Sequence, residues 1–514
     1  MRHHHLPTAL LVALFPLFLA AQPGSLDPSF SGDGLLVSGL FTGNDFARDV
    51  VGLPSGAVLA AGNAVVEGVS RFAVSRTLAD GSLDTDFNGV GYATIGFDDF
   101  NDACFAMTLD ADGAIVLAGY SNNGVQNELA LARLTADGAP DPGFGGNGSV
   151  RLSLAPVSVE IYALAIQPDG RIVVAGNAFN GITGGILVAR FNADGSPDTD
   201  FNGTGHVITN VGDNAVGYGL AVLPDGKLVV GGYAEDSTGP DLLVARYESD
   251  GSPDADFGTD GVVTTDLGQF WERIRAITID ADGSIIFVGT VGTSFAMMDV
   301  LVGRFLANGS LDPAFDVDGV LSIDVAGGVE DGTDILLQPD GRLLVCGSGE
   351  VSGQAQVLLA RLEQSGALDA SFGTDGLVLT DVASGDDYAA ALALAPDGKI
   401  LVAGSNAGSL GSDALLARYF SGLPIGVDEH GEGQRSLQLW PVPAVDHLFV
   451  VHESHDPSAR LWVVAANGQI VTEQHMSARQ QVRLDIADLA PGNYQVVVAD
   501  KSGRSEGRFT KVGR

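Results

Sequence analysis

Short apolar runs alternate along the chain with clusters of turn-forming residues, and the same order of runs returns many times. In one cycle the runs cover residues 162–167, 171–176, 185–190 and 206–211, separated by Pro-Asp-Gly and by a loop rich in Asp, Asn and Gly. Short runs of β-branched and other apolar residues that are bounded by such turns predict β-strands. No stretch shows sustained helical periodicity with caps, so each cycle predicts four strands.

Three sequence marks agree on the number of cycles. The turn glycine recurs at steps of 57, 57, 56, 57, 58 and 57 residues, and an Asp-x-x-Phe motif and an arginine that ends an apolar run recur with it. The glycines are Gly56, Gly113, Gly170, Gly226, Gly283, Gly341 and Gly398; the motifs begin at Asp27, Asp84, Asp141, Asp198, Asp254, Asp312 and Asp369; the arginines are Arg76, Arg133, Arg190, Arg246, Arg304, Arg361 and Arg418. One four-stranded sheet cannot bury both of its faces, whereas seven arranged radially can. The sequence therefore predicts an all-β protein with a seven-bladed β-propeller.

The two ends of the repeat region complement each other. The last cycle ends "ARYFSG" and lacks the usual "DGSLD" continuation, while residues 24–30, "GSLDPSF", supply it. We therefore expect a strand at about Gly34 to Gly39 to complete the sheet that is built from Tyr388 to Tyr419. Such a closure would be non-covalent and would hide a sheet edge that otherwise invites aggregation.

The repeat also resembles a known family. The phrases "DGKILVAGS", "LLARY" and "ADGSLDTDFNGVG" are similar to the delta-60 repeat, a bacterial motif found in extracellular proteins, and the resemblance covers about Gly24 to Phe420. It implies a propeller-like β architecture and secretion, and it implies no particular activity.

The regions on either side of the repeats have a different character. Residues 1–21 contain Arg2 and a short apolar run that ends in small residues near Ala21, which is typical of a secretory signal peptide. The propeller is expected over residues 22–422, a Gly-containing charged linker over 423–436, and a second domain over 437–514. No other stretch is long and apolar enough to span a bilayer, so we expect an exported protein without a membrane span.

The C-terminal domain has balanced charges and alternating runs that predict a small antiparallel β-sandwich. Its segments "LQLWPVPAVDHLFV", "ANGQIV", "LDIADLAPGNYQVVVAD" and "GRFTKVGR" resemble the type A C-terminal sorting domain of the type IX secretion system. The resemblance implies the type IX machinery as a partner, and a secreted protein that is extracellular or attached to the outer-membrane surface. The alternative is an ordinary adhesive or Ig-like domain that stays attached.

Composition narrows the range of partners. Of the 514 residues 45% are hydrophobic, which excludes general disorder, and 64 acidic against 26 basic residues give a net charge of -38. This charge disfavours nucleic acids and anionic membrane surfaces. The only cysteines, Cys104 and Cys346, belong to different repeats, so small buried apolar roles are expected in place of a disulfide. We expect a monomer that binds an unknown extracellular glycan or protein.

The regular arginines could form a ring of cations for an anion. Because an aspartate recurs with each of them, we favour a structural role, in which every arginine pairs with the aspartate of its own Asp-x-x-Phe motif.

The repeated "DTDFNG" resembles the first half of a calcium loop, with oxygen-bearing side chains at alternate positions. The candidate ligands are Asp84, Asp86, Asn88, Asp198, Asp200 and Asn202. The twelfth position, where a bidentate Glu belongs, holds Ile95 or Thr209. We favour turn capping by these side chains, and apart from this possible calcium no cofactor is expected.

We find no catalytic motif and therefore expect no enzyme activity. The leading hypothesis is a binding or structural module whose ligand meets the variable connections at residues 63–70, 120–128, 233–240, 290–298 and 348–356. The alternative is a secreted hydrolase or lyase acting on polysaccharide. Its catalytic group would have to come from the few residues that depart from the repeat, which are His206, Trp271, Glu272, Arg273, Met297 and Met298.

Overall fold

The computed structural model divides the chain into two compact units, residues 1–423 and 424–514. The structure describes residues 22–39, 43–237, 239–382, 384–408, 411–423, 435–440, 447–451, 460–465, 470–475, 481–487, 489, 492–500 and 503–511. The signal peptide expected at residues 1–21 lies outside this range. Within it, no helix is long and apolar enough to cross a membrane.

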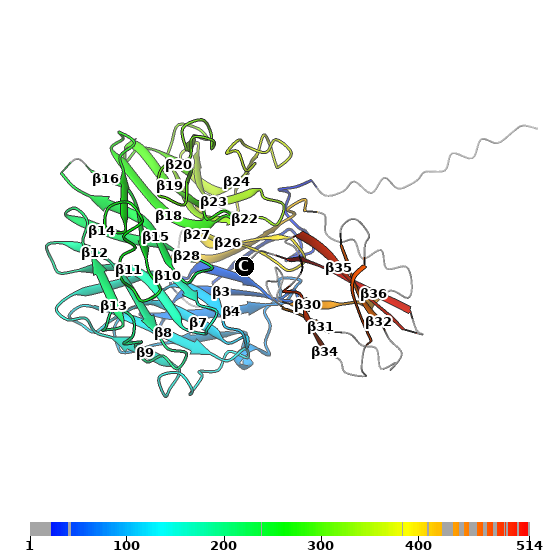
Figure 1. Cartoon of the computed structure of the whole chain (residues 1–514). Helices are drawn as coiled ribbons and strands as arrows, with labels where there is room; N and C mark the ends of the chain where they lie inside the picture. Colours follow the sequence, from blue (N-terminus) through cyan, green and yellow to red (C-terminus); the bar gives the residue numbers. More distant parts are fainter. Residues whose placement is uncertain are drawn as a thin grey trace, which may run out of the picture. The chain divides into compact units, whose positions relative to one another are not determined.

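The described residues of the first unit form seven antiparallel four-stranded sheets, one for each repeat (Figure 1). By sheet, the strands are β2 (Phe46–Gly52), β3 (Val58–Val66), β4 (Val69–Thr77) and β5 (Tyr92–Ile95); β6 (Asp102–Leu109), β7 (Ile115–Asn122), β8 (Asn127–Leu134) and β9 (Ser149–Leu152); β10 (Ser158–Ile166), β11 (Ile172–Phe179), β12 (Gly184–Phe191) and β13 (His206–Thr209); β14 (Asn214–Val222), β15 (Leu228–Glu235), β16 (Pro240–Tyr247) and β17 (Val262–Thr265); β18 (Trp271–Ile279), β19 (Ile285–Ser294), β20 (Met297–Phe305) and β21 (Val320–Ile323); β22 (Glu330–Leu337), β23 (Leu343–Val351), β24 (Gln354–Leu362) and β25 (Leu377–Thr380); β26 (Asp386–Leu394), β27 (Ile400–Gly408), β28 (Gly411–Tyr419) and β1 (Leu35–Ser38). A single 3-10 turn, η1 (Phe87–Gly89), precedes β5.

The sheets close into a ring through the N-terminal strand. As predicted, β1 pairs antiparallel with β28, with Leu35 opposite Ala417 and Ser38 opposite Ala414. Each sheet packs on the next through its first strand, and β2 of the first sheet contacts β26, β27 and β28 of the last. The all-β propeller is therefore confirmed, and the number of sheets fits the seven repeats.

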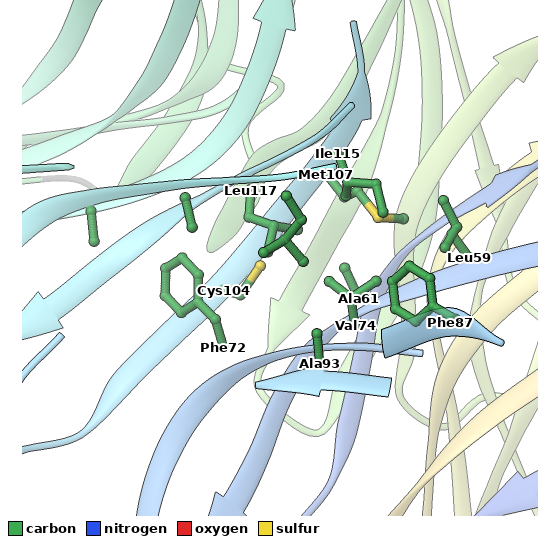
Figure 2. Close-up of a cluster of buried hydrophobic side chains, with 13 residues drawn as sticks. Leu59, Ala61, Phe72, Val74, Phe87, Ala93, Cys104, Met107, Ile115 and Leu117 are labelled. Atoms are coloured by element: carbon green, nitrogen blue, oxygen red, sulfur yellow. The ribbon is translucent and has the colours of Figure 1, made fainter. Parts of the chain in front are cut away.

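Side chains from adjacent sheets share one core at each junction. Figure 2 shows the cluster between the sheet β2–β5 and the sheet β6–β9, where Cys104 lies among Phe72, Leu117 and other apolar side chains. Cys346 lies in the equivalent cluster between the last two sheets, and both cysteines are free and buried. Each fully buried large apolar side chain contributes about 1.5–3 kcal/mol, so these junctions hold the ring together.

One irregularity recurs in every sheet of the ring and was not predicted. The first strand of each sheet carries a β-bulge one third to halfway along its length, where the register against the second strand shifts. The extra residues are Arg48, Phe105, Tyr162, Tyr218, Arg275, Thr333 and Ala390. A bulge re-aims the side chain of the extra residue.

The second unit contains two sheets, as predicted for a sandwich. One has the order β29-β36-β35-β32-β33 and the other β30-β31-β34. The strands are β29 (Arg435–Ser436), β30 (Gln438–Trp440), β31 (His447–Val451), β32 (Arg460–Ala465), β33 (Ile470–His475), β34 (Gln481–Asp485), β35 (Gly492–Asp500) and β36 (Gly503–Lys511). Leu448 and Leu484 of the smaller sheet share one core with Leu461 and Val496 of the larger. Arg435 and Ser436, which fall at the end of the expected linker 423–436, pair with β36.

Candidate functional site

The seven bulged residues meet at one place. All of them line a single pocket of about 370 Å³, together with residues such as Phe46, Asp331 and Tyr388. Each sheet thus contributes one side chain from the same structural position, although the residue types differ. The pocket is therefore built by the repeat but is chemically asymmetric.

Aromatic rings form one wall of this pocket. The Phe105 and Tyr162 ring centroids lie 5.1 Å apart in an edge-on arrangement, and those of Tyr162 and Tyr218 lie 4.8 Å apart. These three half-buried residues come from three consecutive sheets. Burial, followed by a hydrogen bond to Glu160, raises the pKa of Tyr162 well above its usual range, so this tyrosine stays a phenol at neutral pH. Rings held in this way offer an apolar surface on which a ligand can stack.

An arginine stands at each end of the aromatic wall. The Arg48 guanidinium lies 5.5 Å from the Phe105 centroid, and that of Arg275 lies 5.0 Å from the Tyr218 centroid. Arg275 also reaches Asp331 at 3.4 Å, and Arg273 reaches the same carboxylate at 3.2 Å.

Arg48 differs from its counterpart because no carboxylate within the described part of the chain forms an ion pair with it. Its side chain remains accessible to solvent in the pocket. The surrounding protein, followed by the positive charge of Arg275, lowers the pKa of Arg48. A guanidinium in this situation is suited to an anionic ligand group, since it donates several hydrogen bonds in a fixed fork.

Two aspartates next to the bulges hold adjacent sheets together. Asp49 accepts the backbone N–H of Met107 at 2.7 Å, and Asp334 accepts that of Leu392 at 2.9 Å; each donor belongs to the next sheet. Burial raises the pKa of Asp49 to about 7 and that of Asp334 to about 6. These bonds fix the strands from which the pocket residues project.

The regular arginines lie elsewhere, at the junctions between sheets. In every repeat the arginine Nε donates to the aspartate of the Asp-x-x-Phe motif at 2.6–2.8 Å. The pairs are Arg76–Asp84, Arg133–Asp141, Arg190–Asp198, Arg246–Asp254, Arg304–Asp312, Arg361–Asp369 and Arg418–Asp27. Each guanidinium also covers the phenylalanine of the motif, with centroid distances of 4.4–5.3 Å.

The same arginines reach across to the following sheet, which the sequence did not indicate. Arg76 Nη1 donates to the carbonyl of Ala136 at 2.9 Å, and Arg190 Nη1 donates to that of Ser249. The phenylalanine of the motif also contacts the following repeat. Phe87 packs on Gly138, in the loop after β8, where an added Cβ would lie 2.7 Å from the ring. Arginine, aspartate and phenylalanine therefore join neighbouring sheets and do not face a common ligand.

A second cation supports the same aspartate in four repeats. It is the basic residue directly after Pro-Asp-Gly, and its distances to the aspartate are 3.1, 2.9, 3.0 and 3.0 Å for Arg171, Lys227, Arg342 and Lys399. Burial alone would raise the pKa of Asp27, but hydrogen bonds from Ser29 and Lys399 and the charge of Arg418 lower it to about 2. The repeated phrase with Lys or Arg after the turn could have signalled this pairing.

Four of the six calcium candidates use their side chains in hydrogen bonds within the repeat, and Asp86 and Asp200 take part through their backbone N–H groups. Asp84 accepts Arg76 Nε on one carboxylate oxygen and the N–H of Asp86 on the other, and Asp198 does the same with Arg190 and Asp200. The side-chain amides of Asn88 and Asn202 donate to the carbonyls of Tyr92 and His206. Within the described residues, the carboxylates that come close enough to share an ion are two other groups, Asp241–Asp266–Glu272 and Asp299–Asp324–Glu330.

Of the residues that depart from the repeat, five begin two strands of one sheet, β18 and β20, and His206 lies on a different sheet. Trp271 lies between Tyr233 and Phe295, and Arg273 pairs with Asp331 near the central pocket. Glu272 is buried and accepts the N–H groups of Leu267 and Gln269. His206 begins β13, the last strand of its sheet, and Met297 and Met298 begin β20.

Solved structures with a similar chain course were found, all of low sequence identity. An ulvan lyase of polysaccharide lyase family PL25, bound to an oligosaccharide, is 11% identical and covers 75% of this chain and 96% of its own, with a TM-score of 0.43. A protein of unknown function from Dyadobacter fermentans is 10% identical (75% and 97% covered, TM-score 0.41), and Sqt1 from Chaetomium thermophilum is 10% identical (75% and 98%, TM-score 0.40). TM-scores below 0.5 say nothing of what this chain binds. No curated protein matches the chain.

Two family models match the sequence directly. The domain of unknown function DUF5122, a β-propeller repeat family, matches residues 53–87, 111–144, 167–201, 223–257 and 338–372. The secretion system C-terminal sorting domain matches residues 438–511. This confirms the resemblance to delta-60 repeats, which is the name of the DUF5122 repeat family, and the resemblance of the tail. The chain thus carries DUF5122 β-propeller repeats followed by a type IX sorting domain, which directs it to export and a secreted or cell-surface location.

Proposed function

We propose that the exported propeller is a non-catalytic binding module whose central pocket takes an acidic saccharide. A sugar ring would stack on the wall of Phe105, Tyr162 and Tyr218, and its carboxylate or sulfate would lie between Arg48 and Arg275. The observation that carries this proposal is the convergence of the seven bulged side chains, which places an aromatic wall between two arginines in one pocket.

Charge supports an anionic group on the ligand. The protein as a whole carries a net charge of -38, yet the charged residues lining the pocket are Arg48, Arg275 and Asp331. Asp331 is already held by Arg273, Arg275 and the hydroxyl of Thr290, so its charge is compensated within the protein. Arg48 therefore remains available to pair with a negative charge on the ligand.

The groups in the pocket do not favour catalysis. Asp331, the carboxylate that lines it, is tied by three partners and is poorly placed to move a proton. Burial raises the pKa of Tyr388 as well as that of Tyr162, which opposes a role as general base. We therefore propose binding in preference to the hydrolase or lyase alternative.

The test is the binding of acidic and neutral saccharides to residues 22–514, measured by calorimetry after a screen on a glycan array. Arg48→Gln should weaken binding of an acidic saccharide at least tenfold, as expected for a lost charge-assisted contact. Arg151→Gln is the matched control and should leave affinity unchanged, because Arg151 lies on β9, the last strand of its sheet, and pairs there with Asp98. Absence of binding to any glycan, or equal affinity in Arg48→Gln, would contradict the proposal. Release of saccharide fragments with new unsaturated or reducing ends would instead support the hydrolase or lyase alternative.

A further inference from the structure

We propose that Asp299, Asp324 and Glu330 form a binding site for a divalent cation of the calcium type, at the junction between the sheet β18–β21 and the sheet β22–β25. One carboxylate oxygen from each of the three lies within 4.8 Å of the others. Asp299 is on β20, Asp324 directly follows β21, and Glu330 begins β22 of the next sheet.

The charge of the buried member of the group, Glu330, is poorly compensated within the protein. Glu330 is fully buried, and neither of its carboxylate oxygens accepts a well-formed hydrogen bond. A buried carboxylate without partners is strongly unfavourable, because it has lost its hydration without compensation. Burial, followed by the charges of Asp324 and Asp299, raises the pKa of Glu330 to about 7, and a nearby backbone N–H of Glu350 offsets this only in part.

Sister junctions show how the protein normally compensates a carboxylate at this position. The register of the bulged strands aligns Glu330 with Asp102, Glu272 and Asp387, each two residues before the bulge pair. Asp102 is neutralised by Arg71 at 3.3 Å. Glu272 accepts two backbone N–H groups at 2.7 and 2.8 Å, and Asp387 accepts the N–H of Val382 and the amide of Asn406.

At Glu330 the compensating group is missing and further negative charge takes its place. Asp299 lies on β20 where Arg71 lies on β4, five residues before the regular arginine of its repeat. Glu350 adds another negative charge nearby. Within the described residues, no ion pair includes Asp299, Asp324 or Glu330. A bound cation would supply the positive charge that Arg71 supplies in the sister junction.

The oxygen atoms available suit calcium. One oxygen of Asp299 accepts the hydroxyl of Ser322 at 2.7 Å, and one oxygen of Asp324 accepts the N–H of Gly327 at 2.6 Å. Each of the three residues offers one carboxylate oxygen within 4.8 Å of the others, which makes an all-oxygen set. Asp324 is exposed, so the ion can enter from solvent and keep water ligands. Calcium accepts such irregular, carboxylate-rich sets, whereas magnesium demands near-ideal octahedral geometry.

The experiment is titration of CaCl₂ into residues 22–514 after treatment with EDTA, followed by calorimetry and by the melting temperature. We expect saturable binding with a Kd of about 10⁻⁴–10⁻³ M, the range of extracellular calcium modules, and a higher melting temperature with calcium. Glu330→Gln should weaken binding at least tenfold. Asp324→Asn should do the same, and because Asp324 is exposed this variant is expected to fold normally.

Glu272→Gln is the matched control. Glu272 belongs to the equivalent group with Asp241 and Asp266, but its oxygens already accept two backbone N–H groups. Calcium affinity should therefore be unchanged in this variant. No saturable heat at millimolar calcium, or heat that survives both Glu330→Gln and Asp324→Asn, would overturn the proposal. So would loss of the heat in Glu272→Gln alone.

Discussion

The arginine that closes each repeat joins two sheets through one side chain. Arg190 is 5% exposed, pairs with Asp198 at 2.7 Å, covers Phe201 at 4.8 Å and donates to the carbonyl of Ser249 in the next sheet. A planar guanidinium can make these contacts at once, whereas a lysine ammonium cannot. The side chain therefore acts as a fixed connection between neighbouring sheets.

Arg190→Ala should lower the free energy of unfolding by about 3 kcal/mol, because it leaves Asp198 buried with a single cation. That remaining cation is Arg171, at 3.1 Å. Arg171→Ala removes an arginine that is 37% exposed and should cost less than about 1 kcal/mol. Thermal or urea unfolding of both variants measures the difference, and saccharide binding should not change in either. An unaltered melting temperature in Arg190→Ala would show that the contact is not stabilising.

Recurrence in the sequence identified the residues whose side chain is the same in every repeat and missed those whose side chain differs. Every repeat has an arginine and an aspartate at the positions of Arg190 and Asp198, so the pairing of these two could be expected from the sequence. The carbonyl of Ser249 could not, because backbone partners leave no side-chain pattern. The pocket residues were not predicted from the sequence for another reason. Arg48, Phe105, Tyr162, Thr333 and Ala390 occupy one structural position but have unrelated side chains. The sequence does relate these positions, since each lies eight residues before the turn glycine of its repeat. What it does not show is the bulge, a property of the backbone register, which turns the side chains into one pocket.

At the scale of elements, the closure of the ring depends on the N-terminal strand. Strand β1 covers the edge of β28, Asp27 pairs with Arg418 at 2.7 Å, and Phe30 is buried against the first and last sheets. The order of the motifs predicted this closure, because residues 24–30 supply the continuation that the last cycle lacks. Strand lengths were predicted less well. Strand β10 begins at Ser158, ahead of the apolar run that starts at Tyr162, because polar and apolar residues alternate at the start of the strand.

Deletion of residues 22–40 should destabilise the propeller by more than about 5 kcal/mol, because it removes a buried phenylalanine, the partner of a buried arginine and four paired strand residues. It also exposes the β28 edge, so soluble oligomers are expected in size-exclusion chromatography. Asp27→Asn is the milder comparison, which removes only the charge facing Arg418 and Lys399 and should cost less. A melting temperature equal to that of the intact chain would show that β1 is dispensable for closure.

At the scale of the whole molecule, the two units have separate cores and different charge. The tail contributes balanced charges, so the net charge of -38 belongs to the part that precedes it. The core of the tail contains residues of the tail alone, such as Leu448, Leu461 and Val496. The repeat pattern ends at Gly422, next to the point where the contacts divide, at residues 423 and 424.

Separate cores imply that the tail serves export and not the stability of the propeller. In a host with the type IX machinery, a chain that ends at residue 423 should fold with a melting temperature within about 2 °C of the propeller transition in the intact chain, since it keeps every sheet of the ring. It should nevertheless be retained in the periplasm, whereas the intact chain reaches the cell surface or the medium. Leu448→Asp tests the same point at full length, because it places a charge in the core of the tail and should block export without shifting the melting of the propeller. Fractionation and immunoblotting measure both variants, and export of either at the level of the intact chain would contradict the role of the folded sorting domain.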